Sequence, residues 1–200
     1  MPTWAWILIA AAIVVAAVIA FAALRRRRTT QLQERFGPEY DRAVEERGGR
    51  REAEADLGSR LERREKLEIR PLAPDARERY QASWTRVQSE FVDDPPGAVA
   101  SADQLVGSVM SERGYPMDDF EQRVDDISVD HPQVVERYRS AHGIAQKNEQ
   151  GQATTEDLRQ AIKHYRALFE DLLEPAEDQP LRREDTETTD VEREERASRR

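Results

Sequence analysis

The feature that most constrains this chain is an uncharged apolar run over residues 4–24, which four consecutive arginines follow. As a helix, the 21 residues of this run would extend ~31 Å at ~1.5 Å per residue, which matches the ~30 Å hydrocarbon core of a bilayer. Trp4 and Trp6 stand at one end of the run and Leu24 at the other. Indole rings favour the headgroup layer, so the run predicts one transmembrane helix that anchors the chain.

The arginines decide which side of the membrane the rest of the chain should occupy. Arg25, Arg26, Arg27 and Arg28 follow the run directly, and positive flanks are retained on the cytoplasmic side. We therefore expect a single-pass protein of the cell membrane whose N-terminus lies outside and whose residues 25–200 lie in the cytoplasm. The same side chains would attract anionic lipid headgroups.

Two alternatives concern the same run. Ala20-Phe21-Ala22 resembles the cleavage site of a signal peptide, but a secretory signal carries its positive charge before the apolar stretch, and here the order is reversed. Ala12, Ala16 and Ala20 form a stripe of small residues on which two anchors could pack into a homodimer. In so alanine-rich a helix this spacing also arises by chance, and that interpretation is favoured.

Charge and cysteine content exclude several function classes. The net charge is −9, and residues 71–173 alone carry −8. An acidic body argues against nucleic-acid binding, which needs a basic surface to release counterions from phosphates. Because the chain has no cysteine, it can form no disulfide, thiolate metal site or thiol nucleophile.

Residues 29–70 are half charged, with 10 basic and 11 acidic side chains mixed along the segment. A narrow apolar stripe recurs every fourth residue until Gly37-Pro38 interrupts it, and Gly48-Gly49 forms a second break. We expect a charged, solvated helical stalk, with a partner-bound coiled coil as the alternative. The stripe consists of Leu32, Phe36, Tyr40 and Val44.

Residues 71–174 have the sequence pattern of a packed domain. Five amphipathic stretches follow one another without an alternating strand pattern, which predicts an all-α bundle. Three pairs with the spacing of a capping box, at Asp75 and Glu78, Asp130 and Gln133, and Thr154 and Asp157, are expected to open helices. The clearest apolar stripe, on the last helix, contains Leu158, Ile162, Tyr165, Phe169 and Leu172.

The remaining residues, 175–200, contain Leu181 and Val191 as their only bulky apolar side chains, among nine acids and six arginines. Such a composition cannot bury enough surface to offset the entropy of ordering. The sequence therefore predicts four segments: an anchor with its basic flank at 1–28, the stalk at 29–70, a helical bundle at 71–174 and a disordered, mixed-charge tail at 175–200.

Four short motifs carry a resemblance. Residues 36–42 read FGPEYDR, residues 91–95 FVDDP, residues 128–132 SVDHP and residues 164–169 HYRALF. Together they resemble a group of uncharacterised bacterial membrane proteins of actinobacterial type with a single span. The resemblance covers about residues 30–173 and implies no activity, cofactor or catalytic residue.

Candidates for chemistry are few. His131, His142 and His164 could join aspartates at a metal, but no pair has the four-residue spacing of a helical zinc motif. The acids of residues 118–130 lack the ligand pattern of a calcium loop, and we interpret them as a solvated helix face. No GxxxxGK, GxGxxG or GxSxG motif occurs. We therefore predict no catalytic, metal or cofactor-binding residue.

Two classes of function remain. The first is a noncatalytic adaptor or scaffold, held at the membrane, that recruits a cytoplasmic protein. The second is a metal-dependent or enzymatic module whose site is assembled from dispersed His and Asp residues. Histidines that lie apart, together with an open apolar groove, would favour the adaptor, whereas histidines gathered in an acidic groove would favour the second class.

Overall fold

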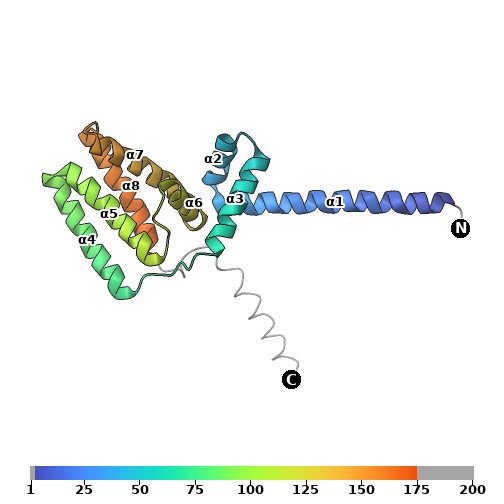
Figure 1. Ribbon diagram of the computed structural model, residues 1–200, viewed down its shortest axis with the longest axis horizontal. Helices are drawn as coiled ribbons and strands as arrows, with labels where there is room; N and C mark the ends of the chain where they lie inside the picture. Colours follow the sequence, from blue (N-terminus) through green and yellow to red (C-terminus); the bar gives the residue numbers. More distant parts are fainter. Residues whose placement is uncertain (1–2, 175–200) are drawn as a thin grey trace, which may run out of the picture. The chain divides into compact units, whose positions relative to one another are not determined.

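The computed structural model describes the backbone of residues 3–174 and the side chains of residues 15–174 (Figure 1). Eight helices and no strand make up this part of the chain. The prediction of an all-α chain is therefore confirmed for the described residues. The tail predicted at 175–200 lies outside them.

The first helix corrects the prediction of an anchor. Helix α1 runs over Thr3–Phe36. Among the residues whose side chains are described, no helix is long and apolar enough to cross a membrane. Of the apolar run over residues 4–24, the side chains from Val15 to Leu24 are among the described ones. The predicted transmembrane helix, the single-pass topology and the sidedness derived from residues 25–28 are contradicted by this finding.

The chain divides into two compact units, unit 1 and unit 2, with the boundary between Ser59 and Arg60. The division falls inside helix α3, which runs over Arg50–Glu65. The segment predicted as a stalk is therefore shared between the units, because the end of α3 packs with the second one.

Unit 1 is a turned-back arrangement of helices rather than a straight stalk. Helix α2 covers Pro38–Arg47, and the predicted breaks before and after it are confirmed. Gly37 and Gly48 have φ angles of 48° and 73°, which L side chains rarely adopt, so the chain reverses there. The stripe that we expected to be solvated contributes to a small core of buried residues, namely Leu32, Phe36, Tyr40, Ala43, Ala53 and Leu57.

Unit 2 contains the predicted five helices. Helix α5 packs against both α4 and α8, α8 also packs against α7, and α6 packs against α7; Figure 1 shows α4, α5, α8 and α7 lying side by side. The bounds are Pro74–Asp93 for α4, Pro95–Arg113 for α5, Phe120–Asp130 for α6, Val135–Glu149 for α7 and Thr155–Leu173 for α8.

The bundle core follows the apolar stripes. Helix α8 buries Leu158, Tyr165, Phe169 and Leu172, while Ile162 is only half-buried at the margin. The central helix α5 contributes small side chains, which let α4 and α8 approach it from two sides. These side chains are Val99, Ala102, Val106 and Val109, all fully buried.

Of the three predicted capping boxes, only one forms. The Thr154 hydroxyl accepts from the Asp157 amide at 3.2 Å, and the Asp157 carboxylate accepts from the Thr154 amide at 2.9 Å. Helix α4 begins after Ala73 without a side-chain cap. Asp130 is the last residue of α6 instead of the start of a helix, because its carboxylate is used in contacts distant in sequence.

Candidate functional site

A groove with a partly apolar lining lies between α4 and α8 in unit 2. It encloses about 450 Å³, within the range of binding clefts. Trp84 and Phe169 stack in its floor with ring centroids 4.8 Å apart, and their exposed fractions are 6% and 2%. The lining residues are Arg77, Gln81, Trp84 and Thr85 from α4, and Phe169, Glu170, Leu173 and Glu174 from the end of α8.

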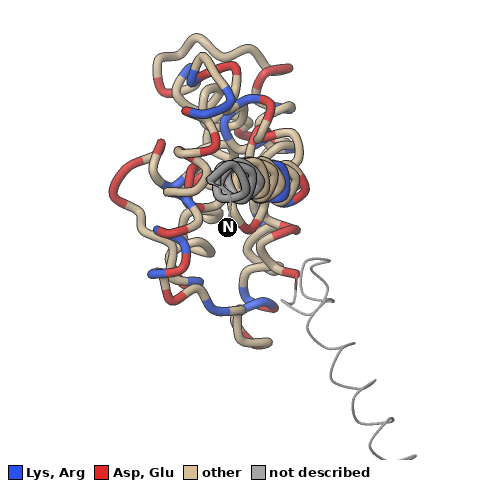
Figure 2. Tube along the Cα trace, turned by 90° about the vertical axis from the view of Figure 1, so that its right-hand side faces the viewer, with Lys and Arg blue, Asp and Glu red and all other residues tan. Residues whose placement is uncertain are grey.

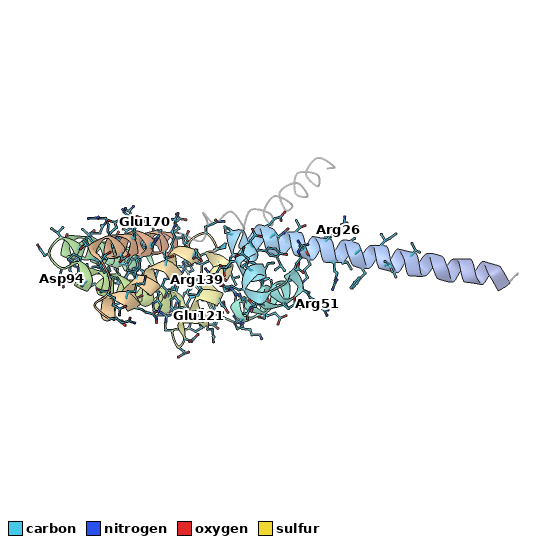
Figure 3. All side chains as sticks on the ribbon, turned by 90° about the horizontal axis from the view of Figure 1, so that it is seen from above. Arg26, Arg51, Asp94, Glu121, Arg139 and Glu170 are labelled. Atoms are coloured by element: carbon cyan, nitrogen blue, oxygen red, sulfur yellow. The ribbon has the colours of Figure 1, made fainter. Side chains whose placement is uncertain are left out.

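The α8 side of this groove is electronegative. Glu170 and Glu174 are exposed there, and Figure 3 shows Glu170 on the outer surface of α8. The last turn of α8 contains no basic residue, so the partial negative charge of the helix C-terminus adds to that of the carboxylates. Glu170 has a neighbour in Arg166, at 3.5 Å on the solvent-exposed surface. The α8 side of the groove is therefore net negative, whereas Arg77 adds one positive charge on the α4 side.

A larger hollow, about 700 Å³, is lined mainly by residues of α4 and α5. Two of its acidic side chains have partners: the Tyr80 hydroxyl donates to Glu112 at 2.7 Å, and the Tyr165 hydroxyl donates to Asp103 at 2.7 Å. Burial on its own would raise the pKa of Asp103, but the nearby His142 imidazole and the Tyr165 hydroxyl outweigh it and hold that pKa below its usual value. Asp103 is therefore an anionic hydrogen-bond acceptor at the edge of the core.

His131 is part of a closed polar cluster. Its Nε2 lies 3.4 Å from Arg113 Nη1, and since a guanidinium only donates, Nε2 accepts and the proton resides on Nδ1. Nδ1 then donates to Asp171. Arg113 also donates to the Leu172 carbonyl at 2.9 Å. The ring resembles an oriented general base, but its side chain is 1% exposed and both nitrogens are occupied, so it presents no atom to a substrate.

The other two histidines lie elsewhere. His142, on α7, stacks on Phe120 with centroids 3.7 Å apart, and its Nδ1 is 3.9 Å from Asp103. His164 is on α8, where burial and then the nearby Arg137 and Lys163 lower its pKa. Among the described side chains, no three His, Asp or Glu residues are arranged to hold a metal ion.

The acidic stretch of α6 corrects a second interpretation. We expected a solvated face. Asp118, Asp119 and Glu121 are exposed as expected, but Asp126 is buried and Asp125 and Asp130 are half-buried. Arg60 contacts Asp125 at 3.0 Å, Arg63 contacts both Asp125 and Asp126 at 3.3 Å, and Arg64 pairs with Asp130. The end of α3 thus supplies the counter-charges for α6. Figure 2 shows how acidic and basic positions are interspersed along the chain.

The residues predicted to fix an anchor have different environments. Trp4 and Trp6 belong to α1, but their side chains lie outside the described ones. Leu24 is 65% exposed. Arg25 and Arg26 line a pocket in unit 1, whereas Arg27 and Arg28 do not.

The same pocket contains Arg50 and Arg51, which sequence reasoning did not single out. They lie about 25 residues further along the chain, so no local spacing links them to Arg25 and Arg26. The Gly48-Gly49 break, which reverses the chain, was the only signal that could have placed them near α1.

Comparison with known proteins adds no functional assignment to this geometry. No protein-family model, curated protein or solved structure matches the chain.

Proposed function

We propose that this protein is a noncatalytic adaptor whose helical bundle binds an amphipathic helix of a partner protein in the groove between α4 and α8. The observation that carries the proposal is the apolar floor of that groove, formed by the stacked Trp84 and Phe169 beside an electronegative edge. Aromatic side chains in such clefts are frequent anchors of binding energy.

The shape of the groove suits a helix. Its α4 wall, from Arg77 to Thr85, extends ~12 Å at ~1.5 Å per residue, or just over two turns. Helices that bind in grooves present apolar residues at positions i, i+3 or i+4, and i+7. A partner with two or three such residues would cover the floor.

The charge of the groove indicates which residues should flank the apolar face of the partner helix. Lysine or arginine beside the apolar face would lie against Glu170 and Glu174, and would also meet the negative end of the α8 dipole. We therefore expect a basic amphipathic helix. The dispersed-site alternative finds less support, because His131 is enclosed and the other histidines belong to different clusters.

Selection of helical peptides against the full chain tests this proposal. From a displayed library of random 15-residue helices, the binders should be enriched in apolar residues at helical spacing and in Lys or Arg on one flank. Thr85→Arg places a bulky cation in the groove. It should weaken a selected peptide by at least about tenfold, the effect of ~1.4 kcal/mol.

Gln88→Arg is the matched control, because Gln88 is exposed on the same helix and lines no described pocket. This variant adds the same charge and should bind like the unaltered chain. Peptides that bind equally well to Thr85→Arg, or binders enriched in acidic residues, would contradict the proposal.

A further inference from the structure

Unit 1 has a pocket of its own, which the proposed adaptor function does not use. It encloses about 440 Å³ between α1 and the start of α3. Figure 3 labels Arg26 on α1 and Arg51 on α3. The pocket is lined by Arg25, Arg26, Thr29 and Thr30 from α1, and by Arg50, Arg51 and Glu54 from α3.

Glu54 holds the two walls together. The Thr29 hydroxyl on α1 donates to Glu54 Oε1 at 2.7 Å, and the Tyr40 hydroxyl on α2 donates to the same oxygen at 3.0 Å. The Tyr40 ring is buried in the core of unit 1. All three helices are therefore joined at this carboxylate, and the exposed side chains of the four arginines surround it.

The electrostatics of the pocket are unbalanced. Four guanidinium groups face one carboxylate, and within the described residues Arg25, Arg26, Arg50 and Arg51 form no ion pair with any acid. Arg25 instead lies over the Phe21 ring, 5.3 Å from its centroid. Two arginines of unit 1 outside the pocket are paired, Arg42 with Glu46 at 2.8 Å and Arg47 with Asp56 at 2.6 Å. The pocket therefore has an excess of positive charge that a bound anion would balance.

The chemistry of the side chains narrows the kind of anion. A guanidinium presents a planar fork of N–H donors that matches two oxygens of a phosphate. Four guanidinium groups from two helices have more N–H donors than one carboxylate can accept as hydrogen bonds. The first turn of α3 also carries Glu52, which competes for the helix N-terminus, so recognition rests on the arginine side chains.

We propose that this pocket binds the phosphate group of a phosphate-bearing anion, with Arg25 and Arg26 on one side and Arg50 and Arg51 on the other. Phosphate chemistry has two sources, a free phosphorylated small molecule and the headgroup of an anionic lipid. Both offer the same oxygens to the same guanidinium groups, and the experiment below separates them.

Calorimetric titration of the full chain with inorganic pyrophosphate measures the site directly. We expect saturable binding of one pyrophosphate per chain. Arg50→Gln/Arg51→Gln should weaken it by at least about tenfold, because each charge-assisted hydrogen bond contributes appreciably to affinity. If that double variant does not fold, as judged by circular dichroism, Arg26→Gln tests the same pocket from the other helix.

Arg27→Gln/Arg28→Gln is the matched control, since it removes the same charge from the adjacent arginines that do not line the pocket. It should change the affinity by less than about twofold, because long-range attraction between exposed charges is screened. Equal losses in the two double variants would show diffuse attraction to a basic surface and overturn the site. Absence of any binding to pyrophosphate and to anionic vesicles would overturn it as well.

Sedimentation with vesicles identifies the source. Vesicles of phosphatidylcholine are compared with vesicles that also contain phosphatidylglycerol. Preferential binding to the phosphatidylglycerol vesicles that pyrophosphate displaces, and that Arg50→Gln/Arg51→Gln loses, assigns a lipid headgroup. Pyrophosphate binding without that preference assigns a free phosphorylated molecule.

Discussion

The apolar interior of unit 2 and its layer of charged contacts differ in how they are encoded. The interior is built from stripes within single helices, such as Leu158, Tyr165 and Phe169 on α8. The charged layer joins residues more than 60 positions apart, with Arg60, Arg63 and Arg64 against the acids of α6. The apolar interior can be recognised in the sequence from the helical spacing of its residues, whereas the charged layer leaves no local sequence pattern.

The two regions should also differ in what they contribute to stability. Apolar burial lowers the free energy of the folded state in proportion to area. A buried ion pair gains Coulomb energy but loses hydration, so its net contribution is small, although loss of one partner is costly. We therefore expect the interior to supply most of the stability, and the charged layer to fix how residues 60–65 pair with α6.

The largest expected effect comes from the interior. Phe169→Ala removes a ring that is stacked on Trp84 and almost fully buried. It should lower the free energy of unfolding by about 3–5 kcal/mol, the usual cost of deleting a core aromatic side chain. Urea denaturation of the full chain measures this change. Phe91→Ala, at a half-buried position of α4, is the control and should cost clearly less; equal costs would show that the packing of α8 is misassigned.

A smaller loss of stability is expected in the charged layer. There, comparing a single variant with a double variant is more informative than either variant alone. Arg60→Met leaves Asp125 and Ser128 without this guanidinium, and should cost about 2 kcal/mol, as for a hydrogen bond to a charged group. Arg60→Met/Asp125→Leu removes both charges and should cost less than the sum of the single changes. Additive costs in a double-mutant cycle would mean that the two side chains do not interact.

The smallest effect should appear on acidification. Because the pKa of Asp103 in the folded protein lies below its usual value, the unfolded chain binds its proton first as the pH falls. The contribution of this carboxylate is therefore present above the pKa of the unfolded chain, ~4, and is lost as the pH falls through the lower folded value. Asp103→Asn should be less stable than the unaltered chain at pH 7, and the difference should shrink at pH 3. A difference that grows on acidification would reverse the sign of this coupling.

The features that could be predicted from the sequence are those that depend on residues close together along the chain. The helices of residues 71–174, the breaks at Gly37 and Gly48, and the cap formed by Thr154 and Asp157 depend on residues within one or two turns, and these predictions are confirmed. Asp130 has the same local spacing as Thr154, but its carboxylate accepts from the Tyr115 hydroxyl at 2.9 Å and from Arg64. A tertiary contact therefore overrode a local rule.

The candidate sites were less accessible to sequence reasoning. The groove depends on which faces of α4 and α8 approach each other, and the basic pocket depends on a reversal that brings residues 50–51 to α1. The arginines at 25–28 stood out only as a run beside apolar residues, which predicted membrane topology. The partition of this run, with two arginines in a pocket and two outside it, is a property of the fold.

The most direct measurement of the central claim asks whether a partner helix reaches the floor of the α4/α8 groove. The chain has three tryptophans, so Trp4→Phe/Trp6→Phe leaves Trp84 as the only indole. Titration of this variant with a selected basic helical peptide that lacks tryptophan should shift the Trp84 emission saturably, with the affinity found for the unaltered chain. Binding at that affinity with an unchanged Trp84 spectrum, and with hydrogen exchange slowed only away from α4 and α8, would contradict the account.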